Sequence, residues 1–495
     1  MTQNLFAPWK RLTEFCSKKY HVSGSLGADR FTVRRGQPFV VISGGGNVEY
    51  GRGRYDCLDL SDRTISTVKT WSSAECKGEI YNTGNGDRVF DALTFDDGSR
   101  ILFEGLDIVE FADAVLVLTV NPNDPQFKSQ WNLHMIGAHT AWRFTQGSSR
   151  VLIGVQDTGL GYCHARRTFH PGLRSGKLFC IKNNVKDNYH RNVKGDSGAM
   201  PDSHGTAVQS IISAATNDQK GISGINWASD TFHIDVLDAN KGDLSLAEAT
   251  WLMLQRARIQ GQRLVVNLSA ENFEPSNRFE QLIEQHEEEA LFVFAAGNAG
   301  VRKLSHPASL ARRYKNVLAV GAAWGSPDYK KEPVANLGDR FKWSNYGVGL
   351  SLMAPSCMPS ACSTGKANAH TKFGWRKRFS GTSAATPHVS GAASLVWSVN
   401  PYLSAVEVRN ILLKTAFDTG KKGYDQYTGY GFVDLDKAVR RAMAIALIES
   451  DFAAYEIPDN SAIGTQKHWK SKETITSQSL SLRLHEISLA SSLCG

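Results

Sequence analysis

The stretch RVLIGVQD, residues 150–157, is a short apolar run that ends in a carboxylate, and it begins the pattern that decides the fold. Its β-branched residues favour a strand over a helix. Because its apolar residues follow one another without alternation, the strand is expected to be buried on both faces. Four further runs of the same kind follow it: TFHIDVLD (231–238), RLVVNLSA (263–270), LFVFAAGN (291–298) and NVLAVGAA (316–323).

Stretches with helical periodicity separate several of these runs, for example LSLAEATWLMLQRARIQG (244–261) and NRFEQLIEQHEEEA (277–290). Strands that alternate with amphipathic helices predict an α/β fold, in which a doubly wound, mostly parallel sheet carries helices on both faces. Such sheets hold their functional residues at the carboxyl ends of the strands. Asp157, Ser269 and Asn298 lie at such ends and are therefore candidate functional residues.

The chain divides into four parts. Residues 1–120 contain short apolar runs between glycine turns, which predicts a small β-rich N-terminal domain. Residues 121–149 begin with the turn-forming NPNDPQF and are expected to be a linker and the entry to the α/β domain. That domain is predicted to extend over residues 150–446, and residues 447–495 form a serine-rich C-terminal tail.

Composition excludes several classes of function. The 495 residues carry a formal net charge of +8, spread along the chain and not gathered into the basic stripe of a nucleic-acid-binding protein. The cluster KFGWRKR (372–378) is interpreted as a solvated loop. No apolar run approaches the roughly 18 residues that a membrane helix needs. Nothing in the sequence predicts a particular oligomeric state.

The redox state and the location of the protein follow from similar observations. The eight cysteines form no CxxC pair and no zinc-binding spacing, so reduced thiols are expected. The first twenty residues lack the apolar core of a secretory signal peptide. We therefore expect a cytoplasmic protein, or one that is exported by a route other than Sec.

Three polar residues together have the chemistry of a nucleophilic enzyme. Asp157 ends its strand in DTG, whereas His204 in SHGT and Ser383 in SGTSAATPH each precede a helical stretch. A serine hydroxyl needs a neutral imidazole to remove its proton, and a carboxylate must fix the tautomer of that imidazole. Asn298, in FAAGNAG, could donate a hydrogen bond to the oxyanion that forms during attack on a carbonyl.

A second serine competes for the role of nucleophile. Ser197 lies in GDSGAM (195–200), which is similar to the motif around the nucleophile of trypsin-like proteases. Those enzymes require the chain order His, Asp, Ser, with the histidine roughly 140 residues before the serine. His139 lies much closer to Ser197 than that, and the surrounding chain alternates strands with helices. Ser197 is therefore assigned to a loop, and Ser383 is the predicted nucleophile.

Taken together, the motifs resemble those of the subtilisin-like serine proteases. VLIGVQDTG, SHGT, AAGN and SGTSAATPH occur in the order found in that family, and WSNYG and GYGFVDLDKAV resemble two further family segments. The resemblance covers residues 125–446. Two departures from the family pattern are Gln156, where an aliphatic residue is usual, and Ser356, where glycine is usual.

The resemblance implies a serine endopeptidase that hydrolyses protein or peptide substrates. Asp157, His204 and Ser383 would be its catalytic triad, an acyl-enzyme its intermediate, and Asn298 its oxyanion donor. No cofactor would be needed for this chemistry. The alternative is a non-catalytic peptide-binding or regulatory protein on the same fold.

The resemblance also implies residues that bind the substrate and a metal ion. Glu271 stands where the family typically has glycine, and it either favours a basic substrate residue or points to solvent. In ATNDQKG (215–221), where the family has a metal-binding loop, Asn217 and Asp218 are candidate ligands of a structural calcium ion. The pocket for the residue before the scissile bond would be walled by Ser269, Ala270, Glu271, Ala295, Ala296 and Gly297.

Two roles are open for residues 1–120. In the subtilisin family, a domain ahead of the protease commonly assists folding and then inhibits the enzyme until it is cut away. The stretch VLVLTV (115–120) could then lie in the substrate groove as a strand before cleavage in or near NPNDPQF (121–127). The alternative is a permanent accessory domain.

Overall fold

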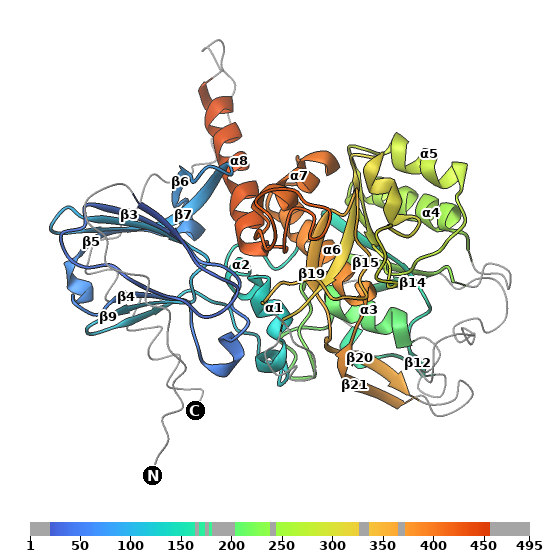
Figure 1. Ribbon diagram of the computed structural model, residues 1–495, viewed down its shortest axis with the longest axis horizontal. Coiled ribbons are helices and arrows are strands. Elements are labelled where there is room, and N and C mark those ends of the chain that lie inside the picture. The colour runs from blue at the N-terminus through green and yellow to red at the C-terminus, as the bar shows by residue number, and fades with distance from the viewer. Residues whose placement is uncertain are drawn as a thin grey trace, which may run out of the picture.

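The computed structural model describes residues 20–163, 168–173, 178–180, 203–237, 244–325, 336–364 and 372–455. Ser197 and residues 456–495 of the predicted tail lie outside the described residues. The described chain forms a β-rich domain followed by an α/β domain, which lie at the left and right of Figure 1. None of the described helices is long and apolar enough to cross a membrane.

Two sheets pack face to face in the N-terminal domain. One has the strand order β1-β3-β8-β7-β5 with β6 paired to β7, and the other has the order β10-β9-β4-β2. Buried side chains from both sheets, among them Leu58 and Phe103, form the core between them. The elements are β1 (Tyr20–Ser23), β2 (Arg30–Thr32), β3 (Phe39–Ser43), η1 (Tyr50–Arg52), β4 (Cys57–Leu60), η2 (Ile65–Thr67), β5 (Val68–Ser72), η3 (Ala74–Cys76), β6 (Glu79–Asn82), β7 (Asp87–Phe95), β8 (Arg100–Glu104), β9 (Ile108–Phe111) and β10 (Val115–Val117).

The α/β domain contains the predicted parallel sheet. Its strand order is β14-β15-β11-β16-β17-β18-β19, and every neighbouring pair is parallel. The strands are β11 (Val151–Asp157), β14 (Leu178–Cys180), β15 (Asp230–Asp235), β16 (Arg263–Leu268), β17 (Ala290–Ala295), β18 (Val317–Ala323) and β19 (Leu352–Pro355). Two antiparallel hairpins lie beside it, β12 (Tyr162–Cys163) with β13 (Thr168–Phe169), and β20 (Met358–Thr364) with β21 (Lys372–Phe379).

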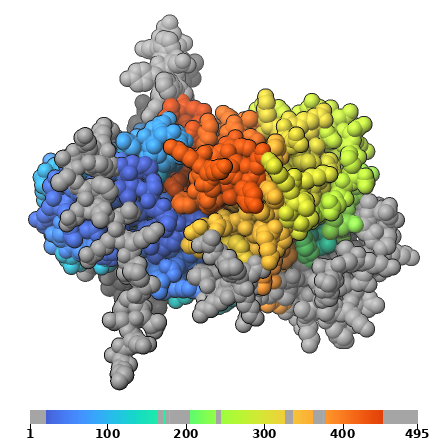
Figure 2. All heavy atoms as spheres, viewed as in Figure 1, coloured from blue at the N-terminus to red at the C-terminus, as the bar shows by residue number. Residues whose placement is uncertain are grey.

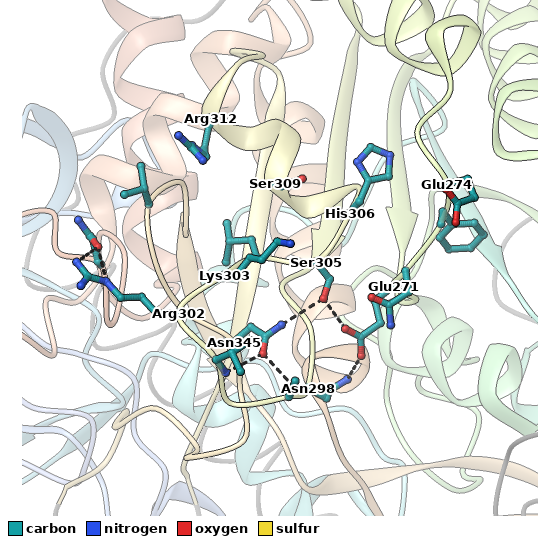
Figure 3. Close-up of a pocket in the computed structure, with 17 residues that line it drawn as sticks. Glu271, Glu274, Asn298, Arg302, Lys303, Ser305, His306, Ser309, Arg312 and Asn345 are labelled. Carbon is teal, nitrogen blue, oxygen red and sulfur yellow. Dashed lines mark hydrogen bonds between the residues drawn. The ribbon is translucent and has the colours of Figure 1, made fainter.

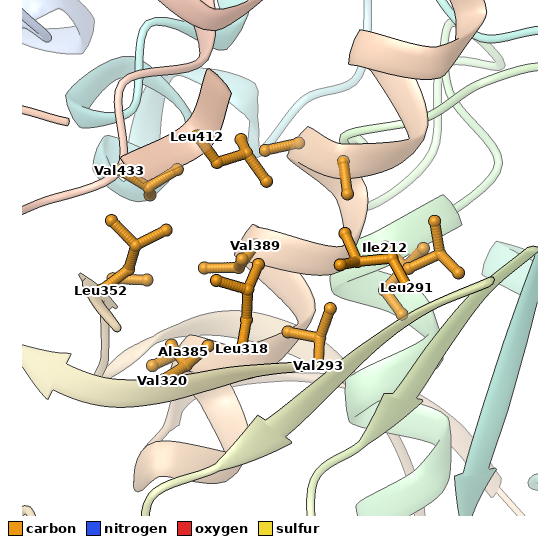
Figure 4. Packing of buried hydrophobic residues seen from close by; sticks show 14 of the residues in the cluster. Ile212, Leu291, Val293, Leu318, Val320, Leu352, Ala385, Val389, Leu412 and Val433 are labelled. Atoms are coloured by element: carbon orange, nitrogen blue, oxygen red, sulfur yellow. The ribbon is translucent and has the colours of Figure 1, made fainter. Parts of the chain in front are cut away.

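Helices cover both faces of this sheet (Figure 1). Almost every residue of α6 is buried, because this helix lies between the sheet and the helices α3 and α8. Figure 4 shows Ala385 and Val389 of α6 among apolar side chains of β17 and β18. The helices are η4 (Phe127–Ser129), α1 (Trp131–Met135), α2 (Ala138–Ala141), η5 (Pro171–Leu173), α3 (Ser203–Ser213), α4 (Leu246–Gln260), α5 (Asn277–Gln285), η8 (Ala308–Arg312), α6 (Thr382–Val399), α7 (Ala405–Thr415) and α8 (Leu435–Tyr455).

The two domains share a buried network of charges. Arg440 on α8 donates to the carbonyl of Val89, and its guanidinium lies 3.2 Å from Asp91 Oδ2 and 2.7 Å from Asp436 Oδ2. Arg143 binds the other oxygen of Asp91, at 3.0 Å. Figure 2 shows the blue N-terminal domain directly against the orange and red C-terminal helices. The first domain is thereby joined to the last helix.

Two expectations about local structure were wrong. VLVLTV does not lie along a substrate groove, because β10 pairs with β9 and its alternating Leu116 and Leu118 are buried in the N-terminal core. KFGWRKR is not a loop but most of strand β21. Trp375 of this strand packs so closely on Gly172 that a Cβ there would lie 2.3 Å from the indole ring.

Candidate active site

Asp157 and His204 meet at the carboxyl end of the parallel sheet. Asp157 is the last residue of β11 and is fully buried, while His204 is the second residue of α3. His204 Nδ1 lies 2.6 Å from Asp157 Oδ1. A carboxylate only accepts hydrogen bonds, so the proton of this bond belongs to Nδ1. The side chain of His204 is 23% exposed, which leaves part of the ring open to a substrate.

The turn after β11 fixes the start of α3. Asp157 Oδ1 also accepts a hydrogen bond from the N–H of Thr158, and Thr158 Oγ1 accepts one from the N–H of Gly205. His233 on the neighbouring strand β15 binds the carbonyl of Thr158 through Nε2, at 2.7 Å. Burial lowers the pKa of His233, although the Thr158 carbonyl and the charge of Asp157 act in the opposite direction. A neutral imidazole therefore supports the turn that holds Asp157.

Ser383 is the second residue of α6, and the chain just before this helix contacts His204. The ring of Phe379, four residues before Ser383, contacts the ring of His204 edge to face at 5.3 Å. In this structure the Ser383 hydroxyl donates to the carbonyl of Ser269 at 2.8 Å, so its rotamer points to the end of β16 and not to His204. Catalytic hydrogen bonds are often not yet formed in an enzyme without substrate.

The segment before Ser383 is held by specific contacts. Gly381 has a φ of +100°, a conformation that only glycine adopts readily. Ser356 Oγ donates to the carbonyl of Gly381 and accepts from its N–H. Ser356, one of the two departures from the family pattern, therefore has a structural role next to the predicted nucleophile.

Asn298 follows β17 and turns toward the N-terminus of α6. Its Oδ1 accepts hydrogen bonds from the N–H and the hydroxyl of Thr382, at 2.9 and 3.2 Å. Its Nδ2 donates to Glu271 Oε1 at 3.2 Å. In the part of the chain that the structure describes, the N–H of Ser383 has no hydrogen-bond partner. The side-chain amide of Asn298 and the backbone N–H of Ser383, at the N-terminus of α6, therefore both lie next to Thr382.

A pocket of about 970 Å³ opens beside Asn298 (Figure 3). Of the predicted wall residues, only Glu271 lines this pocket, and Gly297 lies directly beside it. Glu271 lines the pocket, and a Cβ on Gly297 would lie 2.6 Å from Glu271 Oε2. The other predicted wall residues, Ser269, Ala270, Ala295 and Ala296, adjoin the pocket in sequence but do not line it.

The sequence profile of the subtilase family matches residues 148–431, which is more than half of the chain. The chain belongs to the subtilase family. The match begins after the N-terminal domain, which therefore lies outside it.

Curated relatives of this subtilase include three proteases. The alkaline protease of Shouchella clausii is 30% identical over 356 residues, covering 71% of this chain and 76% of that protein. Subtilisin BL of Lederbergia lenta is 31% identical over 63% of this chain and 98% of its own length, and halolysin of Haloferax mediterranei is 32% identical over 64% and 54%. A solved protease structure from Pseudoalteromonas arctica covers 65% of this chain and all of its own, at 23% identity and a TM-score of 0.49. This subtilase is a serine protease of the subtilisin type.

The predicted calcium ligands lie in the loop after α3, where one side-chain oxygen of each accepts a backbone hydrogen bond. Asn217 Oδ1 accepts from the N–H of Asn123, and Asp218 Oδ1 accepts from the N–H of Lys220. Both residues also donate their backbone N–H groups to the buried carboxylate of Asp124, at 3.0 and 3.1 Å. No group of three or more His, Cys, Asp or Glu side chains in the described ranges could hold a metal ion. Calcium binding at Asn217 and Asp218 therefore stays a prediction.

Several residues of the site were missed by the sequence analysis. Asn345 accepts from the N–H groups of Ala299 and Val301 and so fixes the loop after Asn298. It lies within WSNYG, so the motif marked its position but not its role. Asp124 and Ser305 had no recognisable signal, because their partners are distant in the sequence.

Proposed function

We propose that this subtilase cleaves peptide bonds through a triad of Asp157, His204 and Ser383. The observation that carries the proposal is the 2.6 Å hydrogen bond between His204 Nδ1 and Asp157 Oδ1. With the proton on Nδ1, the lone pair of the imidazole is on Nε2, which is the nitrogen that accepts the Ser383 proton. Asp157 then stabilises the imidazolium, because its charge is buried beside the ring.

Each half of the reaction uses the same residues. Ser383 Oγ rotates away from the Ser269 carbonyl and attacks the carbonyl carbon of the scissile bond, while its proton passes to His204. His204 next gives this proton to the departing amine, which leaves an acyl group on Ser383. A water molecule then attacks the acyl-enzyme with His204 again as base, and the acid product leaves as Ser383 regains its proton.

Two donors would stabilise the negative charge that develops on the substrate oxygen. Asn298 Nδ2 is one, because Thr382 fixes the opposite end of its amide through Oδ1. The N–H of Ser383 is the other, at the positive end of the α6 dipole. Donors that are fixed before the reaction need no reorganisation when the charge appears.

The proposal is tested by removing the nucleophile. Ser383→Ala should abolish both hydrolysis of a peptide library and labelling by a serine-reactive phosphonate probe, because no other group forms the acyl bond. Ser197→Ala is the matched control and should retain both. Hydrolysis that persists in Ser383→Ala would contradict the triad, and a wild-type protein that neither cleaves nor reacts with the probe would indicate a binding protein.

A further inference from the structure

The pocket beside Asn298 lies where the side chain of the substrate residue before the scissile bond would bind. Asn298 would bind the carbonyl oxygen at the scissile bond, and that carbonyl shares its Cα with the side chain of the preceding residue. Glu271 reaches the same pocket from the other side, two residues after Ser269, whose carbonyl contacts the Ser383 hydroxyl. The pocket is therefore next to both the nucleophile and the oxyanion donor.

The carboxylate of Glu271 is held inside this pocket by neutral donors. Asn298 Nδ2 donates to Oε1 at 3.2 Å and Ser305 Oγ donates to Oε2 at 2.7 Å, and Asn345 Nδ2 in turn donates to Ser305 (Figure 3). Each carboxylate oxygen can accept about two hydrogen bonds. One position on each oxygen is therefore left for a ligand.

The backbone directs Glu271 into the pocket. Asn272 has a φ of +65°, the left-handed conformation that asparagine tolerates better than most residues. Its N–H donates to the carbonyl of His306, which fixes the turn. Gly297 leaves room for the carboxylate, since a Cβ there would lie 2.6 Å from Glu271 Oε2. The contacts on both sides of Glu271 thus fix its direction.

No basic side chain in the described ranges forms an ion pair with Glu271. Arg302, Lys303 and Arg312 also line the pocket, and all three are exposed. Both donating nitrogens of Arg302 bind Gln426 Oε1, and Figure 3 shows Arg302 and Arg312 on the side opposite Glu271. A half-buried carboxylate without a cation is therefore available to a basic ligand.

We propose that Glu271 selects substrates with a cationic side chain, of the arginine or lysine type, at the residue before the scissile bond. A guanidinium could bind both carboxylate oxygens with two parallel hydrogen bonds, and an ammonium could bind one of them. This inference rests on the proposed function, because it takes Ser383 as the atom that fixes the position of the scissile bond.

The test compares peptides that differ only in arginine or citrulline at that residue. Citrulline keeps the shape of arginine and removes its charge. The wild-type kcat/KM should be about 10- to 100-fold higher for arginine, the range expected of hydrogen bonds between charged groups. Glu271→Gln should bring the ratio of kcat/KM for the arginine peptide to that for the citrulline peptide close to one. Glu274→Gln changes the other carboxylate of the pocket and should leave the ratio as it is in the wild type.

A binding measurement separates this inference from the triad. The same two peptides, made with a reduced and therefore uncleavable scissile bond, are titrated against the wild type and Glu271→Gln. Tighter binding of arginine that is lost in Glu271→Gln supports the inference even if Ser383 proves not to be the nucleophile. Equal binding and equal turnover of arginine and citrulline by the wild type would overturn it, as would a preference that survives in Glu271→Gln.

Discussion

At the scale of single residues, the proposed oxyanion role of Asn298 predicts an effect on the transition state and not on the bound substrate. Its amide is fixed by Thr382 on one side and by Glu271 on the other. Asn298→Ala should therefore lower kcat by roughly 10²- to 10³-fold and leave KM nearly unchanged, because the donor meets charge that exists only in the transition state. Steady-state kinetics on one peptide substrate measure both constants.

Circular dichroism of Asn298→Ala provides the control for folding. A change confined to KM would assign Asn298 to ground-state binding and would contradict its role as an oxyanion donor.

Single residues of the site differ in how far the sequence could predict them. Asp157, His204, Ser383 and Asn298 each lie in a short motif at the end of a strand or the start of a helix, so local sequence was sufficient to predict roles for them, and those roles stay a prediction. The direction of the Glu271 side chain was left open, because it depends on Ser305, a partner that comes from a different loop. Hydrogen bonds between distant segments are a product of the fold and leave no local pattern.

At the scale of elements, five of the seven described strands of the parallel sheet were predicted to within three residues at each end, and the edge strands β14 and β19 were not predicted. RVLIGVQD became β11 and RLVVNLSA contains β16, because a fully buried strand is apolar throughout. Strand β21 was missed, since its charged residues obscure the pattern around Trp375, which packs on Gly172. Residues 121–149 were expected to be a linker and the entry to the α/β domain, and they include the short helices α1 and α2, whose side chains are mostly buried.

Helix α1 gives the protein a sensitivity to acid. His134 is fully buried there, its ring contacts those of Tyr50, Phe127 and His139, and neither ring nitrogen has a hydrogen-bond partner among the described residues. Burial, together with the nearby His139, lowers the pKa of His134 well below its usual value of about 6.5. The unfolded chain therefore binds a proton below pH 6.5 that the folded chain excludes, and stability falls as the pH falls.

The size of this effect follows from the linkage between protonation and folding. His134 alone should reduce the free energy of unfolding by about 1 kcal/mol between neutral pH and pH 5.5. His134→Phe, which keeps a ring in the aromatic cluster, should remove that part of the pH dependence. Urea unfolding at pH 7.5 and 5.5 measures it, and an equal loss of stability in wild type and variant would refute the assignment.

At the scale of the whole molecule, Asp91 joins the two domains. Burial alone would raise the pKa of Asp91, but Arg143 and Arg440 hold it below its usual range. Asp91→Ala should lower the free energy of unfolding by about 3 kcal/mol, because two buried arginines would lose the carboxylate that they share and would keep only Glu75 and Asp436 as partners. Chemical unfolding followed by fluorescence measures the loss.

The matched control is Glu49→Ala, which breaks an ion pair with Arg54 that is largely exposed. Glu49→Ala should lower the free energy of unfolding by no more than about 1 kcal/mol. If Asp91→Ala were as stable as the control, the buried network would not hold the domains together. Of the two roles considered for residues 1–120, a permanent accessory domain agrees better with a shared buried network than a segment that is cut away.

The same network has a consequence for how the polypeptide is made. Arg440 follows Asp91 by 349 positions, so a ribosome must translate nearly the whole described chain before the second partner of Asp91 exists. Helix α6, which carries Ser383, also packs against α8, so α6 cannot be fully buried before α8 has been translated. The helix that carries the proposed nucleophile therefore becomes fully buried only after α8 has been translated, and an unfinished copy that lacks α8 should have little capacity to digest its neighbours.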